Sequence, residues 1–437
     1  MPAAHPDSFS SVTRIAIIGT GYVGLTTGAC FAHLGHDVVC ADIDVDKVER
    51  LNRGEIPIVE HRLEELVVRG LKRGNLRFVV GAANAVTDCE IAFLCVPTPQ
   101  GEDGSADLSY VEGAAAEIAA LLPYEAIVVN KSTVPVGSTK VVERVLKRPD
   151  VRVVSNPEFL REGSAVDDFL KPDRVVVGCD DRAAAIAVGA LYDSVRAQVI
   201  VTDPASAETI KYAANAFLAT KLSFINAIAA VCEGVGADVN DVVVGMGYDK
   251  RIGTEFLRPG PGWGGSCFPK DSRALLKIAN QAGYRFDLLA GVIAVNDEMF
   301  DRVTGKIARA AGGSLAGKTV AVWGLTFKAR TDDLRDSPSI SIIDRIIAQG
   351  GTVKAFDPTV AGPKNGIPAS VEICADPYSA TAGADVLTVL TEWDDFRWLE
   401  PDKVADVMTG RAVVDGRNLL DRSDWTRAGF THVGLGR

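Results

Sequence analysis

Short apolar runs alternate with helical patterns along the first part of the chain. Residues 13–19 (TRIAIIG) form an Ile-rich run that ends in glycine, and residues 37–44 form a second run that ends in acid. Both patterns predict buried strands. Further strands are expected at 91–96, 126–130, 151–154 and 174–178, with helical patterns between most of them. Strands that alternate with helices predict a parallel, doubly wound α/β sheet.

The pattern changes at about residue 204. Residues 204–234 are Ala-rich and apolar nearly all round, which predicts one long buried helix that joins domains or forms a subunit interface. Helical patterns continue at 270–282 and 286–311, and a second strand–helix alternation has strands at 318–325, 353–357, 386–391 and 412–416. We therefore predict two Rossmann-like doubly wound domains, 1–203 and 314–437, joined by a central helical domain, 204–313.

Composition and charge narrow the class of partner. The chain has 437 residues, of which 47% are hydrophobic and 24% charged, as in an ordinary globular protein. Its formal net charge of -11 argues against nucleic acid as a partner, because a phosphate backbone favours a basic surface. An anionic small molecule remains compatible, since a few local cations and backbone N–H groups can bind one phosphate.

Cysteine usage and hydropathy indicate a cytoplasmic protein. None of the eight cysteines forms a CxxC pair and only five His are present, so we expect no metal site and no disulfide framework. No apolar run reaches the ~18–20 residues of a membrane span. The first eleven residues lack the basic and apolar regions of a secretory signal. We therefore expect no membrane partner.

A glycine-rich turn points to a dinucleotide. Gly19-x-Gly21-x-x-Gly24 lies between a predicted strand and a predicted helix, and Asp42 closes the next strand 23 residues after Gly19. In this arrangement a helix N-terminus binds a pyrophosphate and the acid binds ribose hydroxyls. Asp42 would repel a 2′-phosphate, which favours NAD over NADP. Lys47, five residues later, is either a ribose contact or a solvated helix lysine.

Two threonines follow predicted strands. Thr98 and Thr133 lie in loops where the carboxyl ends of parallel strands face the ligand crevice. Each is either a cofactor contact or an ordinary turn hydroxyl.

Two pairs of polar residues suggest acid–base chemistry. Glu158 and Glu162 would share a helical face if the segment after Pro157 is helical, and each would then raise the pKa of the other towards that of a general base. The alternative is a solvated acidic turn. Lys211 and Asn215 stand one turn apart on the long apolar helix, where they could stabilise an oxyanion and orient a water, or form an interfacial salt bridge.

The glycine-dense segment 259–271 ends where a helix is predicted. Cys267 lies at that junction, and a helix N-terminus lowers the pKa of a thiol, which suits a nucleophile. Asp271, one turn later, would face the same way. The alternative is that Cys267 is a buried hydrophobic residue. In the second α/β half, segment 324–335 is either a degenerate nucleotide site with Lys328 and Arg335 as donors or a surface charge cluster.

Seven motifs in order, GTGYVG, VPTP, STVPVGST, NPEFLREG, Lys-x-x-x-Asn, GWGGSCFPKD and GLTFKARTDDLRDSPS, resemble the UDP-glucose 6-dehydrogenase family over nearly the whole chain. The segment NPEFLREGSAVDDFLKPDRVVVG resembles UDP-glucose enzymes more than GDP-mannose or UDP-N-acetylmannosamine dehydrogenases. Trp263 departs from the Phe or Tyr that is commoner in the family, but the aromatic character is kept.

The resemblance implies an NAD-dependent four-electron oxidation of UDP-glucose to UDP-glucuronate with two NAD per turnover. It implies that Cys267 forms a thiohemiacetal and then a thioester, that Lys211 stabilises the oxyanion and that Glu162 is the base for hydrolysis. A water would be positioned by Asp271, Asn215 and Thr133.

Binding residues are implied in the same way. The cofactor would contact Gly19, Gly21, Val23, Gly24, Asp42, Lys47, Thr98, Thr133, Glu162 and Arg335. The UDP-sugar would contact Glu158, Phe159, Leu160, Arg161, Glu162, Lys211, Asn215, Phe256, Leu257, Arg258, Pro259, Gly260, Gly264 and Lys328.

Two other functions fit parts of this pattern. A two-electron hydroxyacid or sugar-acid dehydrogenase can share the first domain and the Lys-x-x-x-Asn helix, but it has no use for Cys267. A non-catalytic nucleotide-sugar sensor could share the scaffold, but it would be expected to have lost some of the catalytic residues. The long apolar helix also predicts a homodimer, with this helix in the core of a two-fold interface.

Overall fold

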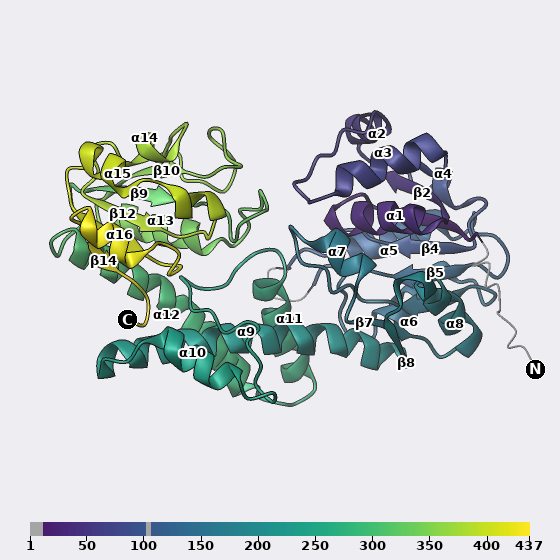
Figure 1. Cartoon of the computed structure of the whole chain (residues 1–437). Helices are drawn as coiled ribbons and strands as arrows, with labels where there is room; N and C mark the ends of the chain where they lie inside the picture. Colours follow the sequence, from purple (N-terminus) through teal and green to yellow (C-terminus); the bar gives the residue numbers. More distant parts are fainter. Residues whose placement is uncertain (1–11, 102–105) are drawn as a thin grey trace, which may run out of the picture. The chain divides into compact units, whose positions relative to one another are not determined.

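The computed structural model describes residues 12–101 and 106–437, and it divides into two compact units between Ala213 and Ala214 (Figure 1). The N-terminal segment in which no secretory signal is expected lies outside the described residues. The division into three domains at 203/204 and 313/314 stays a prediction.

The first unit is built on an eight-stranded sheet of order β3-β2-β1-β4-β5-β6-β7-β8. All neighbouring strands are parallel except β6 and β7, which are antiparallel. The predicted strands are present, and the pattern missed the third and the last. The strands are β1 Arg14–Ile18, β2 Asp37–Asp42, β3 Leu76–Val80, β4 Ile91–Leu94, β5 Ile127–Asn130, β6 Arg152–Ser155, β7 Arg174–Gly178 and β8 Gln198–Thr202.

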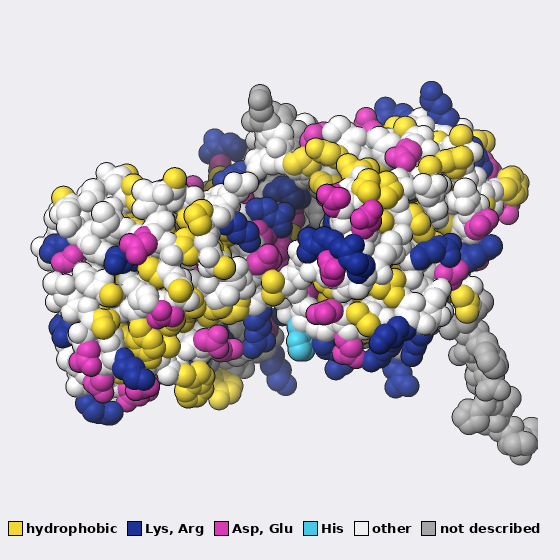
Figure 2. All heavy atoms as spheres, turned by 90° about the horizontal axis from the view of Figure 1, so that it is seen from above, with side chains coloured by type: hydrophobic (Ala, Val, Ile, Leu, Met, Phe, Trp, Pro, Cys, Tyr) yellow, Lys and Arg dark blue, Asp and Glu magenta, His cyan; other side chains and the backbone are white. Residues whose placement is uncertain are grey.

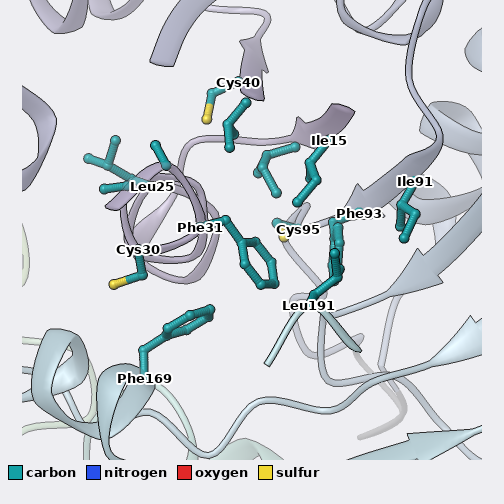
Figure 3. Close-up of a cluster of buried hydrophobic side chains, with 14 of the residues drawn as sticks. Ile15, Leu25, Cys30, Phe31, Cys40, Ile91, Phe93, Cys95, Phe169 and Leu191 are labelled. Atoms are coloured by element: carbon teal, nitrogen blue, oxygen red, sulfur yellow. The ribbon is translucent and has the colours of Figure 1, made fainter. Parts of the chain in front are cut away.

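Helices cover both faces of this sheet, because its central strands are apolar on both sides. Phe31 of α1 packs against Phe93 and Phe169, with ring centroids 5.3 and 5.1 Å apart, in the core on one face (Figure 3). That face carries α1 Tyr22–Leu34, α2 Val45–Asn52, α3 Leu63–Arg73, α7 Ala165–Leu170 and α8 Arg182–Ala190. The other carries α4 Ala83–Val86, α5 Ser109–Ile118 and α6 Ser138–Leu146. A short 3₁₀ helix spans Asp193–Val195.

The predicted long helix is α9, Pro204–Val235. By length and composition it could cross a membrane, since its most apolar 18-residue window has a mean hydropathy of 1.4. The sequence contains no contiguous apolar run of that length, as expected, but this window tolerates isolated charges. Core helices of proteins outside membranes satisfy the same criterion, and 44% of that window is buried against the rest of the chain.

The second unit contains helices and a second sheet. The helices that precede the sheet are α10 Val239–Gly247, which the pattern missed, α11 Phe268–Gln281 and α12 Asp287–Ala310. The sheet is parallel throughout, with the order β11-β10-β9-β12-β13-β14, which repeats the order of the first six strands of the first unit. The two doubly wound sheets are therefore confirmed.

The strands of the second sheet are β9 Thr319–Trp323, β10 Thr352–Phe356, β11 Glu372–Ile373, β12 Val386–Val389, β13 Ala412–Asp415 and β14 Thr431–Val433. Side chains from α12 and α13 Pro338–Ala348 pack on one face. The other face is covered by α14 Pro377–Thr381, α15 Pro401–Val407 and α16 Arg422–Arg427, with a 3₁₀ helix at Asp394–Trp398. On the face of the molecule in Figure 2, acidic and basic side chains are interspersed with apolar ones.

Candidate functional site

The turn between β1 and α1 has the geometry of a dinucleotide loop. Gly19 has a φ of +94°, and a Cβ there would lie 2.7 Å from the Cys95 carbonyl oxygen. A Cβ on Gly24 would lie 1.9 Å from the Gly19 carbonyl oxygen, whereas one on Gly21 would meet nothing within 4 Å. The outer two glycines therefore serve close packing. Gly21 leaves open space at the N-terminus of α1, whose first turn contains no acidic residue. An anionic pyrophosphate fits this position.

Asp42 lies at the end of β2, beside this turn. Its Oδ2 accepts hydrogen bonds from Thr20 N (3.0 Å) and from the Thr20 hydroxyl, and it pairs with Lys47 Nζ at 2.8 Å. Burial opposes the charged form, but the hydrogen bonds from Lys47 and Thr20 outweigh it and lower the pKa of Asp42 to about 2. Asp42 is thus an anion at neutral pH, and a carboxylate can accept hydrogen bonds from the ribose hydroxyls of NAD. Lys47 is an ion-pair partner rather than a solvated helix lysine.

The loops after β4 and β5 are bonded to each other. The Thr98 hydroxyl donates to the Thr133 carbonyl at 2.8 Å, and the Ser132 hydroxyl donates to the Val96 carbonyl at 2.7 Å. Thr98 therefore has a structural role in joining the two loops. Cofactor contact by Thr98 and Thr133 stays a prediction.

The segment around Glu158 departs from the sequence prediction. Residues 156–160 have no regular structure and α7 begins only at Ala165, so Glu158 and Glu162 do not share a helical face. Glu158 is 4% exposed and its Oε1 pairs with Lys211 Nζ at 2.7 Å. Burial disfavours its charge, but Lys211 outweighs burial and lowers the pKa of Glu158. The expected mutual increase in pKa was therefore wrong for Glu158, because its charged neighbour is a cation.

Neighbouring predicted residues surround this ion pair. The Phe159 ring lies 5.5 Å from Lys211 Nζ and 3.6 Å from the guanidinium carbon of Arg174. The Leu160 N–H donates to Glu158 Oε2 at 2.6 Å. Arg161, in contrast, turns its guanidinium to Asp168 at 2.6 Å and is largely exposed.

Two buried charged residues near these loops were missed. Lys131 Nζ donates to Asn156 Oδ1 (3.1 Å) and Tyr192 OH (3.3 Å), and burial lowers the pKa of Lys131 to about 8. Glu208 of α9 accepts from Gly137 N (2.6 Å) and from Thr139, and burial raises its pKa. A lysine that directly follows an apolar strand, and an acid in an apolar helix, were the available signals.

The second unit contains Cys267 and Asp271. Cys267 occupies the N-cap position of α11, and its sulfur lies 3.6 Å from the Ser266 hydroxyl. The thiol is half-buried and outside every apolar core cluster, so the alternative of a buried hydrophobic residue is excluded. Asp271, one turn later, is fully buried, with Asn215 Nδ2 and Lys270 Nζ each 2.7 Å from its oxygens. The predicted junction of loop and helix is confirmed.

The glycines before Cys267 allow close backbone packing. A Cβ on Gly264 would lie 1.9 Å from the Asp336 carbonyl oxygen, and one on Gly265 would lie 2.7 Å from the Phe327 ring. Gly265 N also donates to the Arg335 carbonyl at 3.1 Å. The buried Trp263 donates from its indole to Ser223 at 2.8 Å. The contacts of Gly264 and Gly265 hold the loop before Cys267 against segment 327–336, and that of Trp263 holds it against α9.

The other predicted substrate loop, Phe256–Gly260, has partners in the same unit. Phe256 has a φ of +60° and Leu257 is buried. Gly260 N donates to Asn226 Oδ1 at 2.9 Å. A Cβ on Gly260 would meet the Arg417 guanidinium at 3.1 Å. Arg417 follows β13, and sequence analysis missed it although it lies in a loop at the carboxyl end of a parallel strand.

The second sheet repeats the dinucleotide turn in a closed form. Gly324 follows β9 with a φ of +95°, as Gly19 follows β1, and Asp357 comes directly after β10, where the first sheet has Asp42 as the last residue of β2. Asp357 is 1% exposed and accepts from Leu325 N and from the Trp393 indole. The protein's own donors thus occupy this carboxylate.

The two cations predicted beside this turn have local partners. Arg335 pairs with Asp333 at 2.6 Å, and Lys328 Nζ lies 5.5 Å from the Phe327 ring centroid. Lys328 and Arg335 both lie in the segment between β9 and α13. Their ligand contacts stay predictions.

Comparisons with known proteins match the chain along its length. Models of the UDP-glucose/GDP-mannose dehydrogenase family match at residues 13–196 (NAD binding domain), 205–298 (central domain) and 321–422 (UDP binding domain). A UDP-glucose 6-dehydrogenase of Rhizobium meliloti is 44% identical over 97% of this chain and 99% of its own, and one of Pseudomonas aeruginosa is 45% identical over 97% of each.

Solved structures agree. A UDP-glucose dehydrogenase from Pyrobaculum islandicum has a TM-score of 0.88 and 36% identity, covering 99% of both chains. A UDP-D-ManNAc dehydrogenase from Pyrococcus horikoshii has a TM-score of 0.86 and 27% identity, covering 97% of this chain and 99% of its own. The chain therefore belongs to the UDP-glucose/GDP-mannose dehydrogenase family and is an NAD-dependent oxidoreductase.

Proposed function

We propose that the protein oxidises UDP-glucose to UDP-glucuronate in a four-electron reaction that uses two NAD. The observation that carries this proposal is Cys267, a half-buried thiol at the N-terminus of α11 with the buried Asp271 one turn behind it. A helix N-terminus favours the thiolate. The choice of UDP-glucose as the substrate is supported by the relatives that are named UDP-glucose 6-dehydrogenases.

The chemistry explains why a thiol is needed. NAD, when bound, accepts one hydride in each of two oxidations. The first oxidation converts the C6 alcohol to an aldehyde and needs only a base for the hydroxyl proton. In the second, the Cys267 thiolate adds to the aldehyde carbon, which gives a thiohemiacetal oxyanion whose carbon can release hydride. The resulting thioester is then cleaved by water, which releases the carboxylate product and the thiol.

The other proposed catalytic residues stabilise the oxyanion, activate the water or orient it. Lys211 stabilises the oxyanion, and its pair with Glu158 holds the ammonium in place. Glu162 is the base that activates water for hydrolysis. Asp271 and Asn215, bonded to each other, orient that water together with Thr133.

Ligand binding is proposed for the predicted residues as a group. For NAD these are Gly19, Gly21, Val23, Gly24, Asp42, Lys47, Thr98, Thr133, Glu162 and Arg335. For the UDP-sugar they are Glu158, Phe159, Leu160, Arg161, Glu162, Lys211, Asn215, Phe256, Leu257, Arg258, Pro259, Gly260, Gly264 and Lys328.

Variants of Cys267 test the proposal. Cys267→Ala should lower turnover of UDP-glucose by about a thousandfold or more and leave binding of NAD and UDP-glucose unchanged. Cys267→Ser should stall after the second oxidation, because an ester hydrolyses less readily than a thioester. Intact mass spectrometry should then detect a glucuronyl adduct, and unaltered protein should release two NADH per UDP-glucuronate.

Cys179→Ser is the matched control, because Cys179 is also half-buried and is not among the residues proposed for catalysis or ligand binding. One NADH per product would indicate a two-electron dehydrogenase. No NADH with UDP-glucose would contradict the proposed substrate. Full activity in Cys267→Ala would exclude the covalent mechanism.

We also propose a cytoplasmic homodimer built on α9. Phe217, Phe224 and Val231 are 65%, 49% and 57% exposed and recur at seven-residue intervals, so they lie along one face of the helix. A second copy of the same helix would cover this apolar face in a two-fold interface. The proposed location rests on the cysteine pattern of the sequence, which contains no CxxC pair.

A further inference from the structure

We propose that Glu60 is a positioning residue for Glu162 and that it acts specifically on the hydrolytic step. The inference rests on the proposed function, in which Glu162 activates water. Glu60 comes from the segment between α2 and α3, about a hundred residues before Glu162 in the chain. No sequence motif indicated a link between the two.

Glu60 contacts the residue directly after Glu162, which is Gly163. The N–H of the buried Gly163 lies 2.7 Å from Glu60 Oε2 and 2.7 Å from the Tyr22 hydroxyl oxygen. Tyr22 also donates its own proton to Glu60 Oε2. Gly163 has a φ of +79°, a backbone conformation that a side chain would strain. One buried carboxylate thus fixes the backbone directly after Glu162.

The N-terminal side is fixed independently. The Arg161 N–H donates to Asp168 Oδ2 at 2.8 Å, and the Arg161 guanidinium binds the same carboxylate. The segment that contains Glu60 is also joined to the segment after Glu162 by an ion pair, between Arg62 and Asp167 at 2.8 Å. The backbone is therefore held on both sides of Glu162, and Glu60 supplies the restraint on the C-terminal side.

The strength of the restraint comes from charge and burial. Glu60 is buried, and a hydrogen bond to a carboxylate away from water is about twice as strong as one between neutral groups. Tyr22 is the first residue of α1, directly after Gly21 of the dinucleotide turn. The network therefore joins the turn that receives the cofactor to the loop that carries the base.

Loss of this network should affect one step more than the others. A base must lie within hydrogen-bond reach of the water that it activates, and a displacement of about 1 Å can cost about a hundredfold in rate. Hydride transfer and thioester formation do not use Glu162 as a base. Hydrolysis alone should slow, so the glucuronyl thioester on Cys267 should accumulate.

The experiment compares full-length Glu60→Ala and Glu60→Gln with unaltered protein, using UDP-glucose and NAD. We expect a burst of two NADH per active site at the unaltered rate, followed by a steady-state kcat about 10–100-fold lower in Glu60→Ala. The decrease should be smaller in Glu60→Gln, which keeps a neutral acceptor. Because thioester formation precedes the slow step, kcat/KM for UDP-glucose should fall much less than kcat. Intact mass spectrometry should find the adduct during steady state.

Glu64→Ala, an exposed acid one turn later, is the matched control and should behave like unaltered protein. If Glu60→Ala does not fold, Tyr22→Phe removes the second hydrogen-bond partner of Gly163 and should show the same burst with a smaller decrease in kcat. An equal decrease in burst rate and kcat, or an unchanged kcat, would overturn the inference. Failure of the proposed function is distinguishable, because unaltered protein would then release one NADH or none.

Discussion

Asp42 and Asp357 show how the same residue type at equivalent positions acquires different roles. Each lies at the carboxyl end of the second strand along its sheet's chain and accepts from a backbone N–H group of the turn after the first strand. The Asp42 side chain keeps 12% exposure beside the open position at Gly21, whereas Asp357 is closed off by the Trp393 indole. The difference lies in the neighbours of each carboxylate and not in the carboxylate itself.

Asp42 should therefore decide which cofactor is used. Asp42→Asn removes the charge that would repel a 2′-phosphate, and we expect kcat/KM for NADP relative to NAD to rise about tenfold or more. Because the pKa of Asp42 is about 2, the unaltered preference for NAD should be constant from pH 5 to pH 9. Initial-rate assays with both cofactors measure this, with the exposed neighbour variant Asp46→Asn as control. Equal rates with NAD and NADP in unaltered protein would contradict the assignment.

The first turns of α9 bind two loops of the first sheet, one after β6 and one before α6. Lys211 binds Glu158 after β6, and Glu208, one turn earlier on the helix, binds Gly137 and Thr139 at the start of α6. Gly137 is the N-cap of α6 and has no side chain to cap it. Glu208 therefore supplies from a distant helix the acceptor that α6 lacks.

Removal of this cap should loosen α6 locally. Glu208→Ala leaves the N–H groups of Gly137 and Thr139 without their acceptor, and we expect a loss of about 1–3 kcal/mol in the free energy of unfolding. Hydrogen exchange should speed up most at the first turn of α6. The control is Thr209→Ala, the exposed neighbour on α9. Unchanged exchange in α6 would show that the cap contributes nothing to its stability.

The assembly of the protein depends on the exposed face of α9. If a second copy covers this face, Phe224→Glu introduces a charge into an apolar interface and should convert a dimer into monomers. Sedimentation velocity at micromolar concentration measures the change. Tyr124→Ser, at an exposed aromatic residue in the first unit, should leave the dimer intact. If the unaltered protein sediments as a monomer, the proposed homodimer is wrong.

Strong local patterns made much of the fold predictable. Central strands such as β1 and β4 are buried on both faces and appear as continuous apolar runs, and α9 appears as one apolar helix. Strand β8 was missed because its residues are mostly exposed or half-exposed, and β11 because it has two residues. Helix α10 was missed although its Val-rich segment is apolar.

The sequence was sufficient for features in which the neighbours along the chain supply the physics. The glycine turn, Asp42 and the helix start at Cys267 are of this kind, since backbone geometry and helix ends act over a few residues. Tertiary structure alone paired Lys211 with Glu158 and Glu60 with Gly163, across 53 and 103 residues. It also decided that Glu158 stays charged in a loop instead of raising the pKa of a helical neighbour. The partners of a buried charge depend on which distant segments the sheet brings to its edge, and local propensity does not specify that.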